Sequence, residues 1–266
     1  MKKIFYSILI FLLILLNFST VCADDVDNEG EFENTVEVTA SSVTALPKTN
    51  SRRYIVYDRI SKSMIIGKNE DVKSAMASTT KIMTTIVILE KSDLDETVTV
   101  SAKAGGTGGS RLGLKRGDKA SVKDLLYGLM LRSGNDAAVA LAEHVGGSVK
   151  EFAELMNEKA IELGLTNTHF VTPHGLDDAN HYTTALELAK LTDYAMDNET
   201  FAKIVGTKST TIYINNQPRQ INNTNELLGV LNGVVGVKTG FTNNAGRCLV
   251  TVSYTHLRAH ETAANL

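Results

Sequence analysis

The chain contains no tryptophan and only three prolines among its 266 residues. These absences argue against a surface of stacking aromatic side chains and against an extended proline-rich linker. The chain also lacks a long basic run and has a formal net charge of −3, so nothing in it predicts nucleic-acid binding. Hydrophobic residues make up 43% and charged residues 21%, which is ordinary for a globular protein with one large domain or two small ones.

Cysteine is also scarce, with only Cys22 and Cys248 in the chain. Residues 1–23 follow the order of a secretory signal peptide: a positive start, an apolar run, and then small residues before two aspartates. We expect cleavage after Ala23, which would remove Cys22 together with the signal. The mature chain would then hold a single cysteine and no internal disulfide.

Two other interpretations of this N-terminus remain open. The first is an uncleaved membrane anchor, although the apolar run is shorter than the roughly 20 residues that a spanning helix needs. The second is lipid attachment at Cys22, where the bulky Val21 occupies a position that prefers a small residue. Each of the three predicts export, with the folded part outside the cytoplasm. Residues 24–51 are acidic and rich in serine, threonine, glutamate and asparagine, so we expect a flexible spacer.

The pattern of a folded domain begins at residue 52. Strand-like segments occur near both ends of this region, at residues 54–58, 63–67, 236–241 and 247–253. A helix is expected from Ser78 to Lys91, apolar nearly all round and therefore buried. Capping residues at Ser121, Ser148 and Thr184 begin further helices. The region is therefore expected to have strand-rich ends with a mostly helical insertion between them.

Residues 105–117 carry six glycines and are expected to form a loop. Such a loop could cradle a phosphate, but its spacing fits neither the dinucleotide-binding fingerprint nor a Walker loop. His169, His174 and His181 likewise lack the spacing of a zinc site. We therefore predict neither a nucleotide site nor a metal site, and we expect these histidines to be structural or at the surface.

The first pattern that suggests chemistry is Ser78, followed three positions later by Lys81. One helical turn would bring the hydroxyl and the amine together, and a neutral amine can activate a serine nucleophile. Alone this pattern is weak, because a chain of this length should contain roughly one such pair by chance. Ser78 could equally be a plain helix N-cap and Lys81 a solvated lysine.

Two further motifs follow in order, Ser133-Gly134-Asn135 and Lys238-Thr239-Gly240. Separately they could be a helix-to-helix turn and an edge-strand lysine. Together with Ser78 and Lys81 the three motifs form the set found in penicillin-reactive serine enzymes. With their flanking residues, over residues 53–252, they closely resemble the serine-type D-alanyl-D-alanine carboxypeptidases, which are the low-molecular-mass penicillin-binding proteins.

This resemblance implies an α/β (α+β) fold of the β-lactamase and DD-peptidase type, with an antiparallel sheet flanked by helices and a mostly helical inserted subdomain. It implies that Ser78 is the nucleophile, Lys81 the base and Ser133 a proton relay. Asn135 would hold the substrate amide or orient Lys81. A substrate-binding strand would follow, with Lys238 and Thr239 on the terminal carboxylate, Gly240 allowing close approach, and the backbone N–H groups of Ser78 and Phe241 forming the oxyanion hole.

The same resemblance implies substrates and partners. The substrates would be peptidoglycan pentapeptide stems, β-lactams would be covalent inhibitors, and neither metal nor cofactor would be required. One rival is a β-lactamase, whose middle motif is usually Ser-Asp-Asn and which needs a glutamate to activate water; Glu154 superficially imitates that glutamate. Another rival is a non-catalytic penicillin-binding sensor module.

Residues 253–266 are short and polar and do not resemble this family. One expects another strand and a covering helix there, and often a second domain with a membrane-binding tail. We therefore expect residues 52–252 to form an incomplete catalytic domain with an atypical tail. The resemblance implies that peripheral membrane association would depend on such a C-terminal region.

Overall fold

The computed structural model describes residues 49–254. The predicted signal peptide, most of the predicted spacer and nearly all of the atypical tail lie outside these residues. Contacts divide the chain into two units, Met1–Thr49 and Asn50–Leu266, and every element below belongs to the second. None of the described helices combines the length and apolar character that a membrane span requires.

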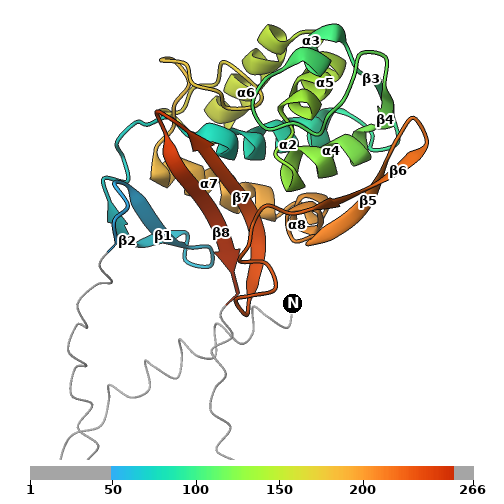
Figure 1. Cartoon of the computed structure of the whole chain (residues 1–266). Helices are drawn as coiled ribbons and strands as arrows, with labels where there is room; N and C mark the ends of the chain where they lie inside the picture. The colour runs from blue at the N-terminus through green and yellow to red at the C-terminus, as the bar shows by residue number, and fades with distance from the viewer. Residues whose placement is uncertain (1–48, 255–266) are drawn as a thin grey trace, which may run out of the picture. The chain divides into compact units, whose positions relative to one another are not determined.

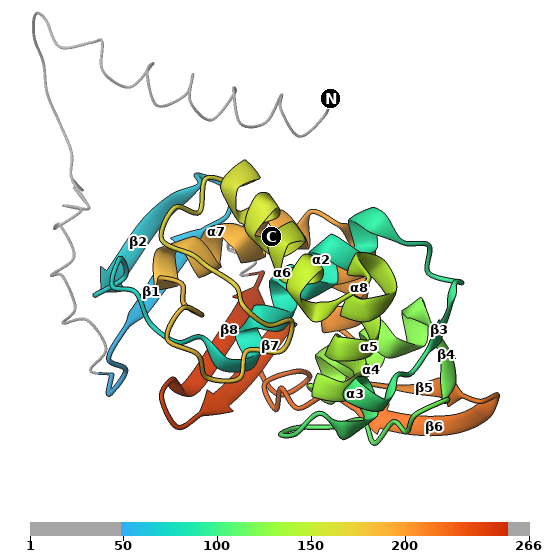
Figure 2. The ribbon, with the colours of Figure 1, turned by 90° about the horizontal axis from the view of Figure 1, so that it is seen from above.

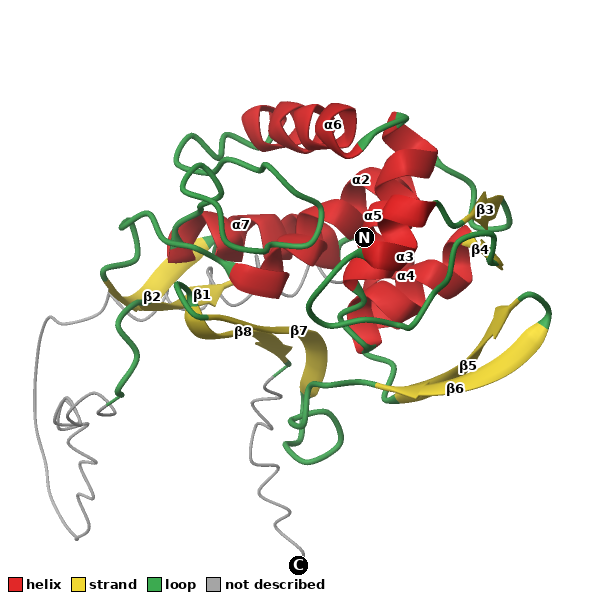
Figure 3. Ribbon diagram, turned by 45° about the horizontal axis from the view of Figure 1, so that its top comes forward, coloured by secondary structure: helices red, strands yellow, loops and turns green. Residues whose placement is uncertain are grey.

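The described strands form antiparallel pairs, each joined by its own hydrogen-bond ladder. These pairs are β1 (Tyr54–Asp58) with β2 (Ser63–Lys68), β3 (Thr97–Thr99) with β4 (Lys119–Ser121), β5 (Ser209–Ile214) with β6 (Gln217–Asn222), and β7 (Val234–Thr242) with β8 (Gly246–Ser253). The predicted hairpin at the start and the predicted strand pair at the end are confirmed. Figures 1 and 3 place the β7–β8 hairpin beside the β1–β2 hairpin, although no ladder among the described residues joins the two.

The helices lie between the first and the last strand pair in the sequence, as predicted. They are η1 (Ala77–Thr80, a 3₁₀ turn), α2 (Lys81–Lys91), α3 (Ala102–Gly106), α4 (Val122–Leu131), α5 (Asn135–Gly146), α6 (Val149–Glu162), α7 (Ala185–Met196) and α8 (Glu199–Val205). The predicted caps are confirmed at Ser121, Ser148 and Thr184, whose side chains accept hydrogen bonds from backbone N–H groups of the first turn. The short helices α3 and α8 were not predicted, because five and seven residues carry too little periodicity. Gly105 and Gly106, which were expected to begin a loop, are the last residues of α3.

Helix α2 is the centre of the core. Its residues 81–88 are all buried, and it packs against α4, α5, α6, α7 and α8. Figure 2 shows α2 enclosed by the other helices. The prediction of a helix that is apolar nearly all round and therefore buried is confirmed.

The start of this helix differs from the prediction. Ser78 does not lie on α2 but on the preceding turn η1, which has 3₁₀ geometry. The hydroxyls of Thr79 and Thr80 donate to the carbonyls of Met76 and Ala77, three residues back, at 2.6 and 2.8 Å. Such side-chain bonds compete with the regular helical pattern and favour the tighter turn.

Candidate active site

Ser78 and Lys81 come together across the boundary between η1 and α2. In a 3₁₀ turn residues i and i+3 eclipse each other, so the expected pairing survives the change of helix type. The Lys81 Nζ lies 2.8 Å from the Ser78 Oγ. Ser78 does not cap α2, whose N-cap residue is Thr80, so its hydroxyl is available to the amine.

The Lys81 amine has two further partners. It donates to the Asn135 Oδ1 and to the His174 carbonyl, both at 2.8 Å. A neutral amine has two N–H groups and one lone pair. If the two N–H groups serve Asn135 and His174, the lone pair is directed at the Ser78 hydroxyl. This arrangement is suited to taking a proton from that hydroxyl.

The surroundings of Lys81 favour the neutral form. Lys81 is fully buried, and burial lowers its pKa well below the ordinary value of 10.5. The positive charge of Lys238 lowers the pKa further, and the carboxylate of Asp136 raises it in part. A lowered pKa favours the neutral amine, which is the form that can act as a general base.

The Ser133-Gly134-Asn135 motif lies where α4 ends and α5 begins. Asn135 is the first residue of α5, and its amide nitrogen donates to the Gly108 carbonyl at 2.8 Å, which orients its oxygen toward Lys81. Ser133 is buried in the left-handed region at φ 58°. Its hydroxyl makes no hydrogen bond within residues 49–254, so the structure joins Asn135, but not Ser133, to the Lys81 network.

The third motif lies on β7, against the turn that carries Ser78. A Cβ added to Gly240 would be 2.8 Å from the Ser78 backbone nitrogen, so only glycine allows this close approach. Lys238 is buried, which lowers its pKa to about 7. The Thr239 hydroxyl lies 3.1 Å from that of Thr224, and Phe241 at the strand's end is 64% exposed.

The glycine-rich loop before α4 does bind a negatively charged group, but this group is a side chain of the protein itself. The Asp136 carboxylate is fully buried and accepts from the backbone N–H groups of Leu112, Gly113 and Leu114 at 2.7–2.9 Å. It also accepts from its own neighbour Ala137 at 3.0 Å. Sequence reasoning missed this residue, although the acidic side chain directly after Asn135 was a usable signal.

Replacing Asp136 with asparagine is expected to lower the free energy of unfolding by about 2–4 kcal/mol. The amide NH₂ group of asparagine would face backbone donors, leaving buried N–H groups without an acceptor. Urea denaturation measures the change. The matched control is Asp197→Asn, at a side chain 67% exposed in its ion pair with Arg59, where we expect a loss below about 1 kcal/mol. Equal effects of both substitutions would contradict this role of Asp136.

The histidines have separate surroundings. The His174 backbone binds Lys81, and burial lowers the pKa of its imidazole to about 3. The His181 ring bonds to Thr80, whereas His169 bonds to the Asn180 carbonyl. Within residues 49–254, no group of three histidine, cysteine or acidic side chains is placed to hold a metal ion. Sequence reasoning missed the contacts of His174 with Lys81 and of His181 with Thr80.

Glu154 is not near this site. Its side chain is 61% exposed on α6 and lies 3.9 Å from the Lys150 amine, one turn away. This placement does not support a role for Glu154 as the water-activating carboxylate of a glutamate-dependent β-lactamase.

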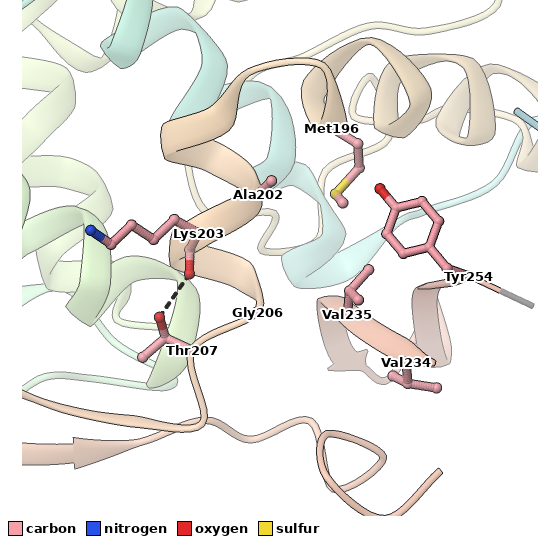
Figure 4. Close-up of a pocket in the computed structure, with 8 residues that line it drawn as sticks. All are labelled: Met196, Ala202, Lys203, Gly206, Thr207, Val234, Val235 and Tyr254. Carbon is pink, nitrogen blue, oxygen red and sulfur yellow. Dashed lines mark hydrogen bonds between the residues drawn. The ribbon is translucent and has the colours of Figure 1, made fainter. Parts of the chain in front are cut away.

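A surface pocket of about 380 Å³ lies toward the other end of β7 (Figure 4). Its lining residues are Met196, Ala202, Lys203, Gly206, Thr207, Val234, Val235 and Tyr254. Figure 4 shows the Lys203 side chain pointing away from the ring of Tyr254. The lining is mostly apolar and contains none of the residues that the motifs select, so this pocket is not part of the candidate site.

Residues 38–259 match the family model described as D-alanyl-D-alanine carboxypeptidase. The D-alanyl-D-alanine carboxypeptidase DacF of Bacillus subtilis is 38% identical over 201 residues, which cover 73% of this chain and 52% of that protein. The D-alanyl-D-alanine carboxypeptidase DacC of Escherichia coli is 39% identical over 235 residues, covering 79% of this chain and 55% of that protein. The chain thus spans about half the length of these curated relatives.

A solved structure extends the likeness to three dimensions. The crystal structure of the Streptomyces K15 DD-transpeptidase matches with a TM-score of 0.74 and 36% sequence identity, covering 79% of this chain and 87% of that one. The predicted fold class, antiparallel strands with helices in the DD-peptidase arrangement, is confirmed by this match.

Proposed function

Because the chain belongs to the D-alanyl-D-alanine carboxypeptidase family, we propose that it is a serine peptidase that removes the terminal D-alanine from peptidoglycan stem peptides and is acylated by penicillins. The observation that carries this proposal is the Lys81 amine, which is buried and lies 2.8 Å from the hydroxyl of Ser78. An exported protein has access to these substrates, and the composition of residues 1–23 supports export.

In the proposed reaction Ser78 attacks the carbonyl carbon between the two terminal D-alanines. Its proton passes to the neutral Lys81, whose two N–H groups are held by Asn135 and His174. The carbon–nitrogen bond then breaks, and the leaving amine takes up a proton, which we assign to relay through Ser133. Water attacks the resulting ester, releases the shortened peptide and restores the Ser78 hydroxyl.

The substrate carboxylate is assigned to the strand motif. A positive charge on Lys238 and the hydroxyl of Thr239 suit a carboxylate, and Gly240 lets the peptide lie close to β7. The N–H groups of Ser78 and Phe241 are assigned to the oxyanion, where donors directed at the developing charge lower the barrier. Asn135 is assigned to orienting Lys81, which its 2.8 Å contact supports.

The test uses the full chain with a diaminopimelate- or lysine-containing pentapeptide and follows the release of D-alanine. Labelling by a fluorescent penicillin is measured in parallel, since a non-catalytic sensor would be labelled but release nothing. Nitrocefin distinguishes the remaining rival: turnover many times per second would identify a β-lactamase. We expect D-alanine release, stable penicillin labelling and no such turnover of nitrocefin.

The second-order rate constant kcat/KM for a pentapeptide is expected to fall as the pH rises above about 7. Lys238 has a pKa of about 7, so it is charged below that pH and neutral above it, where it attracts the carboxylate less. Since kcat/KM reports the free enzyme, the fall should appear in its pH profile. On the acid side the profile should fall where Lys81 becomes protonated.

A matched substrate checks the assignment of the alkaline fall. The same pentapeptide ending in an amide lacks the terminal carboxylate, so its kcat/KM should be low throughout and should not fall near pH 7. A carboxylate substrate whose kcat/KM still rises at pH 9 would contradict the role of Lys238.

A further inference from the structure

The carbonyl of Ala77, immediately before the nucleophile, is held in an unusual backbone conformation. Ala77 has φ 48°, in the left-handed region that residues with a Cβ rarely adopt. Its carbonyl accepts the hydroxyl proton of Thr80 at 2.8 Å. Both residues are buried. A conformation of this kind persists only where its surroundings determine it.

The tautomer of the His181 ring determines which atom donates in the hydrogen bond between His181 and Thr80. His181 Nδ1 lies 3.0 Å from the backbone nitrogen of Val171, which can only donate. Nδ1 therefore carries no proton, and the proton of the neutral ring is on Nε2. Nε2 lies 2.7 Å from the Thr80 Oγ1 and donates to it. Burial lowers the pKa of His181 to about 4, so this tautomer persists at neutral pH.

The loop that carries His181 also lies in close contact with the carbonyl of Ala77. A Cβ added to Gly175 would lie 1.9 Å from the Ala77 oxygen, and Gly175 itself has φ 85°. The preceding residue, His174, offers its carbonyl to Lys81 at 2.8 Å. One loop therefore contacts both the peptide before Ser78 and the amine that faces it.

The carbonyl of Ala77 and the N–H of Ser78 belong to one planar peptide group. Fixing the direction of the carbonyl therefore fixes the opposite direction of the N–H. The Ser78 nitrogen lies beside β7, where a Cβ on Gly240 would be only 2.8 Å away. In the reaction proposed above, this N–H binds the oxyanion.

We propose that His181 is a positioning residue, which acts through Thr80 to hold the Ala77–Ser78 peptide with its N–H directed at the oxyanion. The inference rests on the proposed function for the oxyanion role of Ser78. This positioning role requires a hydrogen-bond donor at the Nε2 position of the ring. The acceptor at Nδ1 only secures the ring to Val171.

Two substitutions separate these two bonds. His181→Gln retains a donor at the reach of Nε2, and His181→Asn retains an acceptor at the reach of Nδ1 but cannot reach Thr80. We expect the rate of acylation by a fluorescent penicillin to fall about 10- to 100-fold in His181→Asn, less than the cost of removing an oxyanion donor outright. In His181→Gln it should stay within about 3-fold of wild type, since the donor to Thr80 is kept.

Two substitutions of Thr80 supply an independent pair of variants. Thr80→Ser keeps the hydroxyl, whereas Thr80→Val replaces it with a methyl group of similar size, so only Thr80→Val should match His181→Asn. The double variant His181→Asn with Thr80→Val should be no slower than either single one, because both break the same chain of bonds. Reversible binding of a D-alanyl-D-alanine peptide should change little in any variant.

Other outcomes overturn the inference. Equal rates for His181→Gln and His181→Asn would assign His181 to loop stability alone, and thermal unfolding of each variant reports that stability directly. Weakened peptide binding with an unchanged acylation rate would also overturn it. Because the readout is acylation, wild-type labelling without D-alanine release would refute the carboxypeptidase function and leave the positioning role measurable. A wild-type chain that penicillin does not label would refute both.

Discussion

Replacing Ser78 with alanine is expected to abolish penicillin labelling and to reduce D-alanine release about 10⁵-fold, to the background of the assay. Without the Oγ there is no atom to form the acyl-enzyme, and water would have to attack the peptide directly. The Lys81 amine would lose one of its three partners but keep Asn135 and His174, so we expect the variant to fold.

The measurement combines labelling with calorimetric binding of a D-alanyl-D-alanine peptide. The dissociation constant of the peptide should be within about 3-fold of the wild-type value. The strand motif assigned to the substrate carboxylate is unchanged, and reversible binding of the peptide does not require the nucleophile. The control is Ser209→Ala at an exposed position on β5, which should be labelled normally. Stable labelling of the Ser78→Ala variant would place the nucleophile elsewhere.

Replacing Lys81 with methionine is expected to lower the rate of penicillin acylation about 10³- to 10⁴-fold. Methionine has a similar length and is unbranched, so it can occupy the buried space but cannot accept the Ser78 proton. The loss should be in the acylation rate, with penicillin still bound reversibly. Stopped-flow measurement over a range of penicillin concentrations separates the two quantities.

Stability provides the check on this second variant. A buried amine replaced by an apolar chain of similar volume often leaves stability unchanged or improved, while the Asn135 Oδ1 and the His174 carbonyl each lose a donor at 2.8 Å. We therefore expect a net change within about 2 kcal/mol. Lys150→Met, at a side chain 89% exposed on α6, serves as the matched control. Acylation within tenfold of wild type would exclude Lys81 as the base.

Sequence reasoning predicted most of the elements that position the site, because these elements rest on local signals. The caps at Ser121, Ser148 and Thr184 each depend on residues within one turn. The β7–β8 pairing depends on two strand-like segments joined by a short turn. The start of α2 was misplaced because the hydroxyls of Thr79 and Thr80 bond backward to nearby carbonyls, an outcome that propensity alone does not specify.

The surroundings of the motifs were not predictable in the same way. Lys81 meets Asn135 and His174 from 54 and 93 positions away, and Thr80 meets His181 from 101 positions away. The sequence of the glycine-rich loop suggests only a phosphate cradle with the wrong spacing, whereas in the structure its N–H groups bind the Asp136 carboxylate. A pattern search along the chain has no access to such partners.

The sequence by itself selected the side chains to which we assign the chemistry, since Ser78, Lys81 and the two later motifs are recognisable by type and order. The tertiary structure decided what state those side chains are in. It buries Lys81 and so lowers its pKa. It also places the Asn135 Oδ1 and the His174 carbonyl where they accept from the amine, which in a neutral amine leaves the lone pair for the Ser78 hydroxyl. Desolvation and hydrogen-bond direction depend on segments that are distant in the chain, and only packing brings those segments into contact.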